Sequence, residues 1–153
     1  MTADTTRRRL LTGAGSMLAI TLVPRHGLAT PDKMQAEIAA LYGERAITEG
    51  RVTLKMPALA ENGNSVPMRV SVPDSPMTAE DHVRSITVFS PENPLPVIAR
   101  FHLSPRSGKA DVALRIRLAD SQVMVAIAEM SDGTLWRGTA ETIVTLAACI
   151  DLT

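Results

Sequence analysis

Most of this 153-residue chain alternates between apolar and polar residues, and short turn sequences interrupt the alternation at regular spacing. A period of two places successive side chains on opposite faces of a β-strand, so each run predicts a strand with one buried face. Residues 123–130 are almost all apolar, which predicts a strand buried on both faces. The predicted strands cover residues 52–56, 66–72, 85–89, 97–103, 112–118, 123–130, 135–138 and 141–148.

The separators between these runs contain the residues that turns require. Asn62-Gly63 and Asp132-Gly133 are typical of tight hairpins, in which both central residues adopt positive φ, and we interpret Asn62 and Gly63 as turn formers. Proline-containing turns occupy 73–76, 91–94 and 105–108. Many short strands without intervening helices predict an all-β chain folded as an antiparallel β-sandwich.

One helix is predicted, over residues 31–46. Pro31 suits the first helical position and Asp32 interacts favourably with the helix dipole in the first turn. Met34, Ile38, Leu41 and Tyr42 recur on one face. The sequence therefore predicts an all-β sandwich with one N-terminal helix.

Residues 1–29 have the three parts of an export signal. Arg7 and Arg8 lie in a basic segment, residues 10–23 are apolar, and small residues precede a cleavage site after Ala29. The apolar stretch is too short to span a bilayer. Thr6–Thr12 resembles a twin-arginine signal with Leu10 in place of the usual Phe, which predicts export of the folded chain to the periplasm. An ordinary N-terminal helix or a general secretory signal is the alternative.

This interpretation divides the chain into a signal peptide (1–29), a sandwich domain (30–146) and a C-terminal arm (147–153). The leader holds four of the 16 basic and one of the 16 acidic residues, so 12 basic and 15 acidic residues remain without it. A mildly acidic domain lacks the basic surface that nucleic acid or an anionic membrane requires, and we expect neither partner.

The chain contains a single cysteine, Cys149. It therefore has no intramolecular disulfide, no paired-cysteine redox motif and no cysteine-rich zinc site. Cys149 acts alone or with another molecule, unless it is a small buried apolar residue. Asp151 would if anything raise the pKa of the thiol, and no basic residue flanks Cys149 in sequence.

The remaining candidates predict structure rather than chemistry. His82 and His102 lack metal-ligand spacing, and no residues suggest a catalytic triad, so we expect no metal and no cofactor. Trp136 is interpreted as a core or dimer-interface residue, and Arg115 and Arg117 as solvated side chains or a partner contact. The irregularly spaced methionines are interpreted as core and interface residues: 34, 56, 68, 77, 124 and 130.

Three stretches in order resemble a known family. They are Pro57–Pro67 with its Ala-Glu-Asn-Gly-Asn sequence, Ile86–Phe101, and Arg115–Leu135. Together with the terminal cysteine they are similar to SoxY, the sulfur-carrier subunit of the periplasmic thiosulfate-oxidising system. The resemblance implies an immunoglobulin-like sandwich that pairs with a second small sandwich, SoxZ. It also implies that Cys149 carries sulfur intermediates covalently while separate enzymes oxidise them.

The end of the chain departs from that pattern. SoxY proper ends in Gly-Gly-Cys-Gly-Gly, whereas here Ala147 and Ala148 precede Cys149, and Ile150 and Asp151 follow it. This ending resembles the SoxY-related proteins whose arm ends in Ala-Ala-Cys-Ile-Glu. Alanines stiffen an arm relative to glycines. We expect the extended chain to continue from Ile143 to the cysteine, with four residues reaching about 13 Å past the fold.

Three functions remain open from the sequence. The first is a non-enzymatic periplasmic carrier of a sulfur intermediate on Cys149, served by a SoxZ-like partner and by sulfur-oxidising or dehydrogenase enzymes. The second is a structural or assembly subunit of a periplasmic complex with the same partner. The third is a thiol enzyme, which has no general base or second cysteine to support it.

Overall fold

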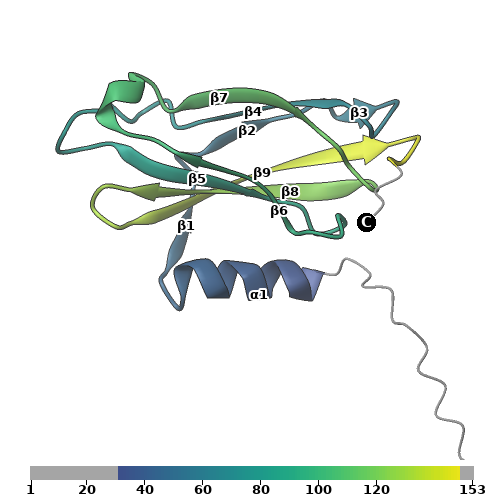
Figure 1. Cartoon of the computed structure of the whole chain (residues 1–153), viewed down its shortest axis with the longest axis horizontal. Coiled ribbons are helices and arrows are strands. Elements are labelled where there is room, and N and C mark those ends of the chain that lie inside the picture. The colour runs from purple at the N-terminus through teal and green to yellow at the C-terminus, as the bar shows by residue number, and fades with distance from the viewer. Residues whose placement is uncertain (1–30, 149–153) are drawn as a thin grey trace, which may run out of the picture.

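A computed structural model describes residues 31–148 as two β-sheets packed face to face, with one helix against the outside of the larger sheet (Figure 1). The larger sheet has the order β1-β9-β8-β5-β6, and β3 also pairs with β9. The smaller sheet has the order β2-β4-β7. The elements are α1 (Pro31–Tyr42), β1 (Ile47–Glu49), β2 (Thr53–Lys55), β3 (Leu59–Ala60), β4 (Val66–Ser71), β5 (Val83–Phe89), β6 (Val97–His102), a 3-10 turn (Pro105–Ser107), β7 (Asp111–Ile116), β8 (Gln122–Met130) and β9 (Leu135–Val144).

Alternating side chains build the core between the sheets. In β4, Val66, Met68 and Val70 are buried while Pro67 and Arg69 are exposed. The facing side of β8 contributes small and flexible side chains, among them Ala126 and Met124. The predicted sandwich is confirmed, because each run with a period of two has one face to bury.

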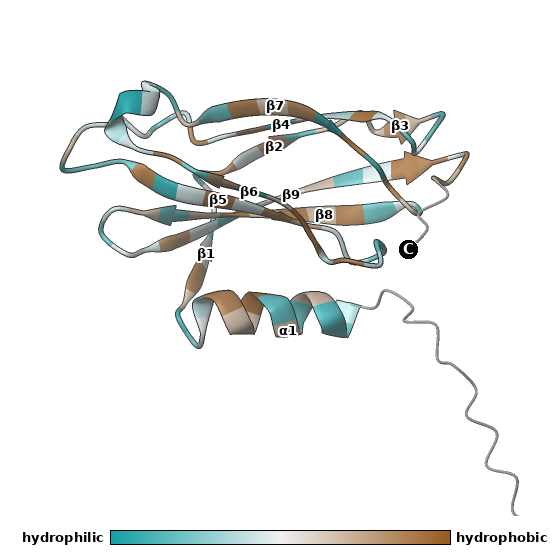
Figure 2. Ribbon diagram, viewed as in Figure 1, coloured by the Kyte–Doolittle hydropathy of each residue, from teal (hydrophilic) through white to brown (hydrophobic). Residues whose placement is uncertain are grey.

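The other face of β8 packs against the helix. Val125 and Ile127 form a second apolar cluster with Met34 and Ile38 of α1. Tyr42 belongs to this cluster, and its hydroxyl donates a hydrogen bond to Thr87 Oγ1 at 2.9 Å. The prediction that this strand is buried on both faces is confirmed, and Figure 2 shows the strand largely in the colours of apolar residues.

Two boundaries differ from the prediction. The helix ends at Tyr42 rather than residue 46, because Gly43 adopts φ +63° and its N–H caps the carbonyl of Ala39 at 2.8 Å. The two strands predicted at 135–138 and 141–148 form one continuous strand, β9, which ends at Val144, so residues 145–148 lie outside it.

The short strands β1 and β3 were not predicted, and both pair with β9 in parallel. They have three and two residues, too few to show a period in sequence. They arise because the long outer edge of β9 needs backbone partners. Between them the chain passes so close over Gly138 that a Cβ there would overlap the carbonyl oxygen of Val52.

The hairpin predicted at Asp132-Gly133 joins β8 to β9, with a backbone different from the one expected. Only Gly133 has positive φ, at +86°. Its N–H donates to the Met130 carbonyl at 3.0 Å, and the Met130 N–H donates to the Thr134 carbonyl at 3.0 Å. The turn is therefore longer than a two-residue hairpin, and a single left-handed residue closes it.

Five of the six methionines interpreted as core residues are buried, and Met56 packs against the core. Trp136 packs partly against the core, beneath the Arg51 guanidinium at 5.4 Å from the ring centroid. Within residues 31–148 no helix has the length and apolar character to span a membrane.

Candidate functional site

The residue on which the carrier hypothesis depends lies just outside the described range. Cys149, Ile150 and Asp151 fall beyond residue 148, and Arg7 and Arg8 of the predicted signal fall before residue 31. Ala147 and Ala148, the first two residues of the predicted arm, are described. The structure therefore shows how the chain is held immediately before the cysteine.

The chain does not simply extend β9 toward the arm. It bends at Thr145 and Leu146, so the prediction of an unbroken extended segment is wrong. Thr145 stays bound to the segment around β3 as the chain bends, because its N–H donates to the Ala60 carbonyl at 3.1 Å and its hydroxyl to the Glu61 carbonyl at 2.9 Å. The chain thus follows the loop after β3 instead of leaving along the strand axis.

Three backbone hydrogen bonds then hold the root of the arm. The Gly63 N–H donates to the Leu146 carbonyl at 2.8 Å, and the Leu118 N–H donates to the Gly63 carbonyl at 2.9 Å. The Ala148 N–H donates to the Leu118 carbonyl at 3.1 Å, and Ala148 is buried. We call Gly63, Leu118, Leu146 and Ala148 the arm anchor. It joins three segments that lie far apart in sequence.

Gly63 serves the anchor because it has no side chain. A Cβ there would overlap the Leu118 carbonyl oxygen and would lie 2.9 Å from the Ala148 nitrogen. Its φ is not positive, and it does not join two paired strands, since β3 pairs with β9 and β4 with β2 and β7. Its interpretation as a hairpin residue is therefore wrong, although Gly63 lies in a turn as predicted. Asn62 does form a turn, because its Oδ1 accepts the Asn64 N–H at 2.8 Å.

A buried polar network supports the anchor from behind. Asn93 donates from Nδ2 to the Arg117 carbonyl at 2.8 Å and accepts the Ala119 N–H on Oδ1 at 2.9 Å, on either side of Leu118. Ser90 and Gln122 are hydrogen-bonded to each other, and each is also hydrogen-bonded to Asn93. Sequence reasoning treated residues 91–94 only as a turn. The only signal available in the sequence was an asparagine within a proline-rich loop, and its burial became visible in the structure.

Apolar side chains gather at the end of the sandwich that carries the anchor, which we call the arm end. Leu59 and Ile143 are register partners in β3 and β9, and Val123 lies at the start of β8. Leu146 belongs to the anchor, and Leu95 lies in the loop that Ser90 and Asn93 stabilise. These five are the large apolar side chains left exposed in the part of the chain that the structure describes. Figure 2 shows the end of β9 as strongly apolar.

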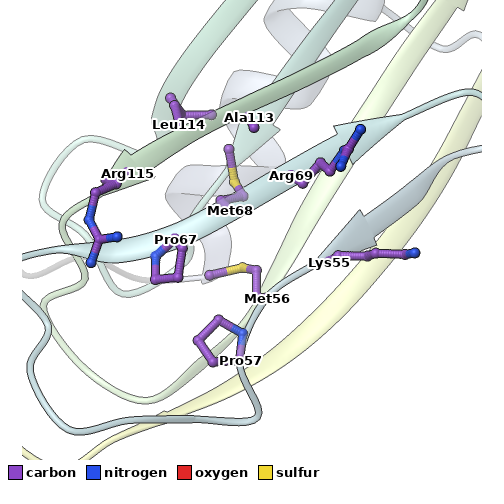
Figure 3. Close-up of a pocket in the computed structure, with 9 residues that line it drawn as sticks. All are labelled: Lys55, Met56, Pro57, Pro67, Met68, Arg69, Ala113, Leu114 and Arg115. Atoms are coloured by element: carbon purple, nitrogen blue, oxygen red, sulfur yellow. The ribbon is translucent and has the colours of Figure 1, made fainter.

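An open hollow lies on the outer face of the smaller sheet (Figure 3). This open groove of about 550 Å³ is floored mainly by apolar atoms. Arg69 at its rim is paired with Asp111 and thereby lowers the pKa of that carboxyl group. Arg115 donates to Ser65 Oγ at 2.6 Å, beside the loop that holds Gly63. Apart from the amine of Lys55, the lining offers no nucleophile or base; its other residues are Met56, Pro57, Pro67, Met68, Arg69, Ala113, Leu114 and Arg115.

The two histidines do not lie near the anchor. His82 and His102 both border a pocket near the start of β5. Across residues 31–148 no group of three or more His, Cys, Asp or Glu side chains is arranged to hold a metal ion.

Solved structures with the same fold include one close in sequence. The sulfur carrier protein SoxY from Chlorobium limicola f thiosulfatophilum is 33% identical, covers 75% of this chain and 98% of its own, and superposes with a TM-score of 0.63. The superoxide reductase (neelaredoxin) of Ignicoccus hospitalis is 24% identical over 76% of this chain and 94% of its own, with a TM-score of 0.54. At that identity the likeness shows the fold alone.

No curated protein sequence matches the chain. The profile described as "Sulfur oxidation protein SoxY" matches residues 38–149, which is most of the chain. Together with the 33% identity to a solved SoxY, this match shows that the chain belongs to the SoxY family.

Proposed function

We propose that the chain is an exported carrier that holds a sulfur intermediate covalently on Cys149. The observation that carries this proposal is where the family match ends. The SoxY profile stops at residue 149, which is the single cysteine of the chain. The related Chlorobium limicola protein is described as a sulfur carrier.

The chemistry requires a thiolate. A free thiol has a pKa of about 8.5, so a small fraction is ionised at neutral pH. The Cys149 thiolate attacks the outer sulfur of a donor persulfide; the donor S–S bond breaks, and its electron pair leaves on the donor thiolate. Cys149 becomes a persulfide, and the transfer involves no net oxidation. Oxidation of the bound sulfur then belongs to separate enzymes, and the chain itself acts as carrier rather than catalyst.

The arm anchor supports presentation at a defined place. Consecutive α-carbons lie about 3.8 Å apart, so Cys149 follows directly on an anchored residue, Ala148. In a glycine arm, by contrast, the backbone on both sides of the cysteine is free to rotate. Enzymes that load or unload this carrier therefore approach the arm end, and a shallow active site suits them better than a deep tunnel.

Partner and location form part of the same proposal. The leader directs the folded chain to the periplasm by the twin-arginine route, where a SoxZ-like sandwich pairs with it. The exposed apolar side chains at the arm end favour such a contact, because clustered exposed apolar residues mark protein interaction sites. An enzyme that loads or removes the sulfur would also bind at the arm end.

The test is the intact mass of the protein purified from the periplasm without reductant. A carrier shows additions of about 32 Da, one sulfur atom each, which disappear on reduction and are absent from Cys149→Ser. Full activity of Cys149→Ser in the producing organism would overturn the proposal. A mass showing only bare thiol or a disulfide-linked dimer would favour the assembly subunit instead.

A further inference from the structure

A polar pocket of about 360 Å³ lies on the outer face of the larger sheet, away from the arm. Ser85, His102 and Glu129 are register partners in β5, β6 and β8, so their side chains project from the same face. The register shifts between Val83 and Ser85, and this bulge redirects Arg84 toward the same place. The lining residues are His82, Arg84, Ser85, Arg100, His102, Leu103 and Glu129.

Two buried polar atoms of this lining have no hydrogen-bond partner within residues 31–148. One is Ser85 Oγ, on a residue only 3% exposed, and the other is His82 Nδ1. Buried polar groups are nearly always hydrogen-bonded, because leaving one unpaired incurs its full desolvation penalty. A hydroxyl and a ring nitrogen facing one pocket therefore point to a ligand that hydrogen-bonds to both.

The charge in the pocket is positive. Neither Arg84 nor Arg100 forms an ion pair with any described residue, whereas Glu129 is paired with Arg45 at 2.9 Å. Glu129 is the one carboxylate in the lining. Two guanidinium groups with unused donors thus remain beside the unpartnered hydroxyl. Guanidinium forks match the paired oxygens of oxyanions, and hydroxyl and imidazole groups add single donors.

We propose that this pocket binds a small tetrahedral oxyanion of the sulfate type, held by Arg84, Arg100, the Ser85 hydroxyl and the His82 ring nitrogen Nδ1. The pocket lies at the end of β8 near Leu135, while the arm leaves the other end of β9 (Figure 1). Leu135 and Val144 are the first and last of the 10 residues of β9, which places them about 30 Å apart. The oxyanion site is therefore separate from Cys149 and does not depend on the carrier function.

The experiment titrates sodium sulfate into the protein while amide NMR shifts are recorded, with sodium chloride added to constant ionic strength. The expected result is a saturable shift of the amides of Ser85, Arg100 and His102. Arg100→Ala should weaken the sulfate Kd at least 10-fold, because it removes a charge-assisted hydrogen bond, and Ser85→Ala should weaken it several-fold.

Arg117→Ala is the matched control, because it removes the same charge from an exposed arginine that does not line the pocket. It and Cys149→Ser should bind sulfate like the original chain. Non-saturating shifts, or equal affinity in Arg100→Ala and Arg117→Ala, would overturn the proposal. The two proposals can fail independently. If the protein binds sulfate but its Cys149 carries no sulfur, the carrier proposal fails and the oxyanion proposal stands.

Discussion

Gly63 shows how a residue without a side chain contributes to the placement of a reactive group elsewhere. Its amide and carbonyl groups both take part in the arm anchor, and a Cβ on this residue would overlap the Leu118 carbonyl oxygen. Close backbone approach of this kind requires glycine whatever its φ. The glycine of the Asn-Gly pair is therefore required by the packing of the arm anchor rather than by the local turn.

We expect Gly63→Ala to release the arm. The new methyl group meets backbone atoms of Leu118 and Ala148, which cannot rotate away, so the hydrogen bonds between them should break. Stability should fall by about 1–3 kcal/mol, and the Ala148 amide should exchange hydrogen faster.

Gly43→Ala is the control for this change. Gly43 adopts φ +63° and has no atom within 4 Å of where a Cβ would lie, so the substitution strains the backbone without a clash. It should reduce stability by about 1 kcal/mol and leave exchange at Ala148 unchanged. Equal exchange at Ala148 in both variants would show that Gly63 does not hold the arm.

Acid should weaken the β8–β9 hairpin through Asp132. The backbone N–H and hydroxyl of Thr134 donate to its carboxylate and hold its pKa below the usual range. A carboxyl group whose pKa is lowered on folding stabilises the fold above its unfolded pKa of about 3.9, and this contribution is lost as the pH falls through the folded value. Asp132→Asn keeps an oxygen acceptor but removes the charge, so it should be less stable than the original chain at neutral pH.

Urea unfolding from pH 7 down to pH 2 measures this difference, which should shrink as the pH falls. Glu141→Gln provides the comparison, because the Glu141 side chain forms no hydrogen bond or ion pair with the described residues. If the difference in the free energy of unfolding between Asp132→Asn and the original chain does not change with pH, then the charge of Asp132 does not stabilise the hairpin.

Among the elements, the loop between β5 and β6 supports the anchor through its hydrogen bonds to the backbone on either side of Leu118. Ser90, Asn93 and Gln122 are buried polar residues that bond to one another and to the backbone around Leu118. Such a network is stable only when every member is satisfied, and it then specifies one loop conformation. The β-sandwich thereby holds the chain segment that accepts the Ala148 N–H.

Asn93→Ala should therefore destabilise the fold and loosen the arm together. It leaves the Arg117 carbonyl and the Ala119 N–H without their partner, at a cost of about 2–4 kcal/mol. Urea denaturation and hydrogen exchange at Leu118 and Ala148 measure the two effects.

Asn64→Ala is the control, since Asn64 bonds only to Asn62 on the surface and should change stability by less than about 1 kcal/mol. If the Ala148 amide in Asn93→Ala exchanges hydrogen as slowly as in the original chain, then Asn93 does not support the anchor.

At the scale of the molecule, the two ends of the sandwich differ in chemistry. The arm end bears the exposed apolar residues and the anchor, while the opposite end bears two unpaired arginines and the unpartnered hydroxyl of Ser85, as far as the described residues show. A long hairpin, β8–β9, runs between them and keeps them apart. One small domain can therefore present an apolar docking surface and a polar pocket at the same time.

Replacing both Leu59 and Ile143 with threonine should weaken binding of a SoxZ-like partner at least 10-fold. Both side chains are more than half exposed and pair across β3 and β9, so the double variant removes apolar surface without opening the core. Analytical ultracentrifugation of the pair measures the affinity, and unfolding should shift by less than about 1 kcal/mol. Arg100→Ala at the opposite end should leave the affinity unchanged. An unchanged affinity in the double variant would place the partner elsewhere.

The sequence by itself determined the sandwich, because a period of two and an unbroken apolar run each fix which faces of a strand are buried. It predicted the α1 face that packs on the larger sheet for the same reason: burial depends on local periodicity. It also identified Cys149 as a candidate, because this is the single cysteine of the chain and because the chain resembles SoxY. These features depend on residues that are close together in sequence.

Tertiary structure alone decided how residues 146–148 are held. The bend after Val144, the close approach of Gly63 and the support from Asn93 depend on residues that lie 24 to 85 positions apart along the chain. No local pattern encodes which carbonyl will lie beside a given glycine. The convergence of Arg84, Arg100 and Ser85 has the same origin, since strand register and one bulge bring them together. Sequence therefore indicated the residue that carries chemistry, and packing determined the surroundings in which it works.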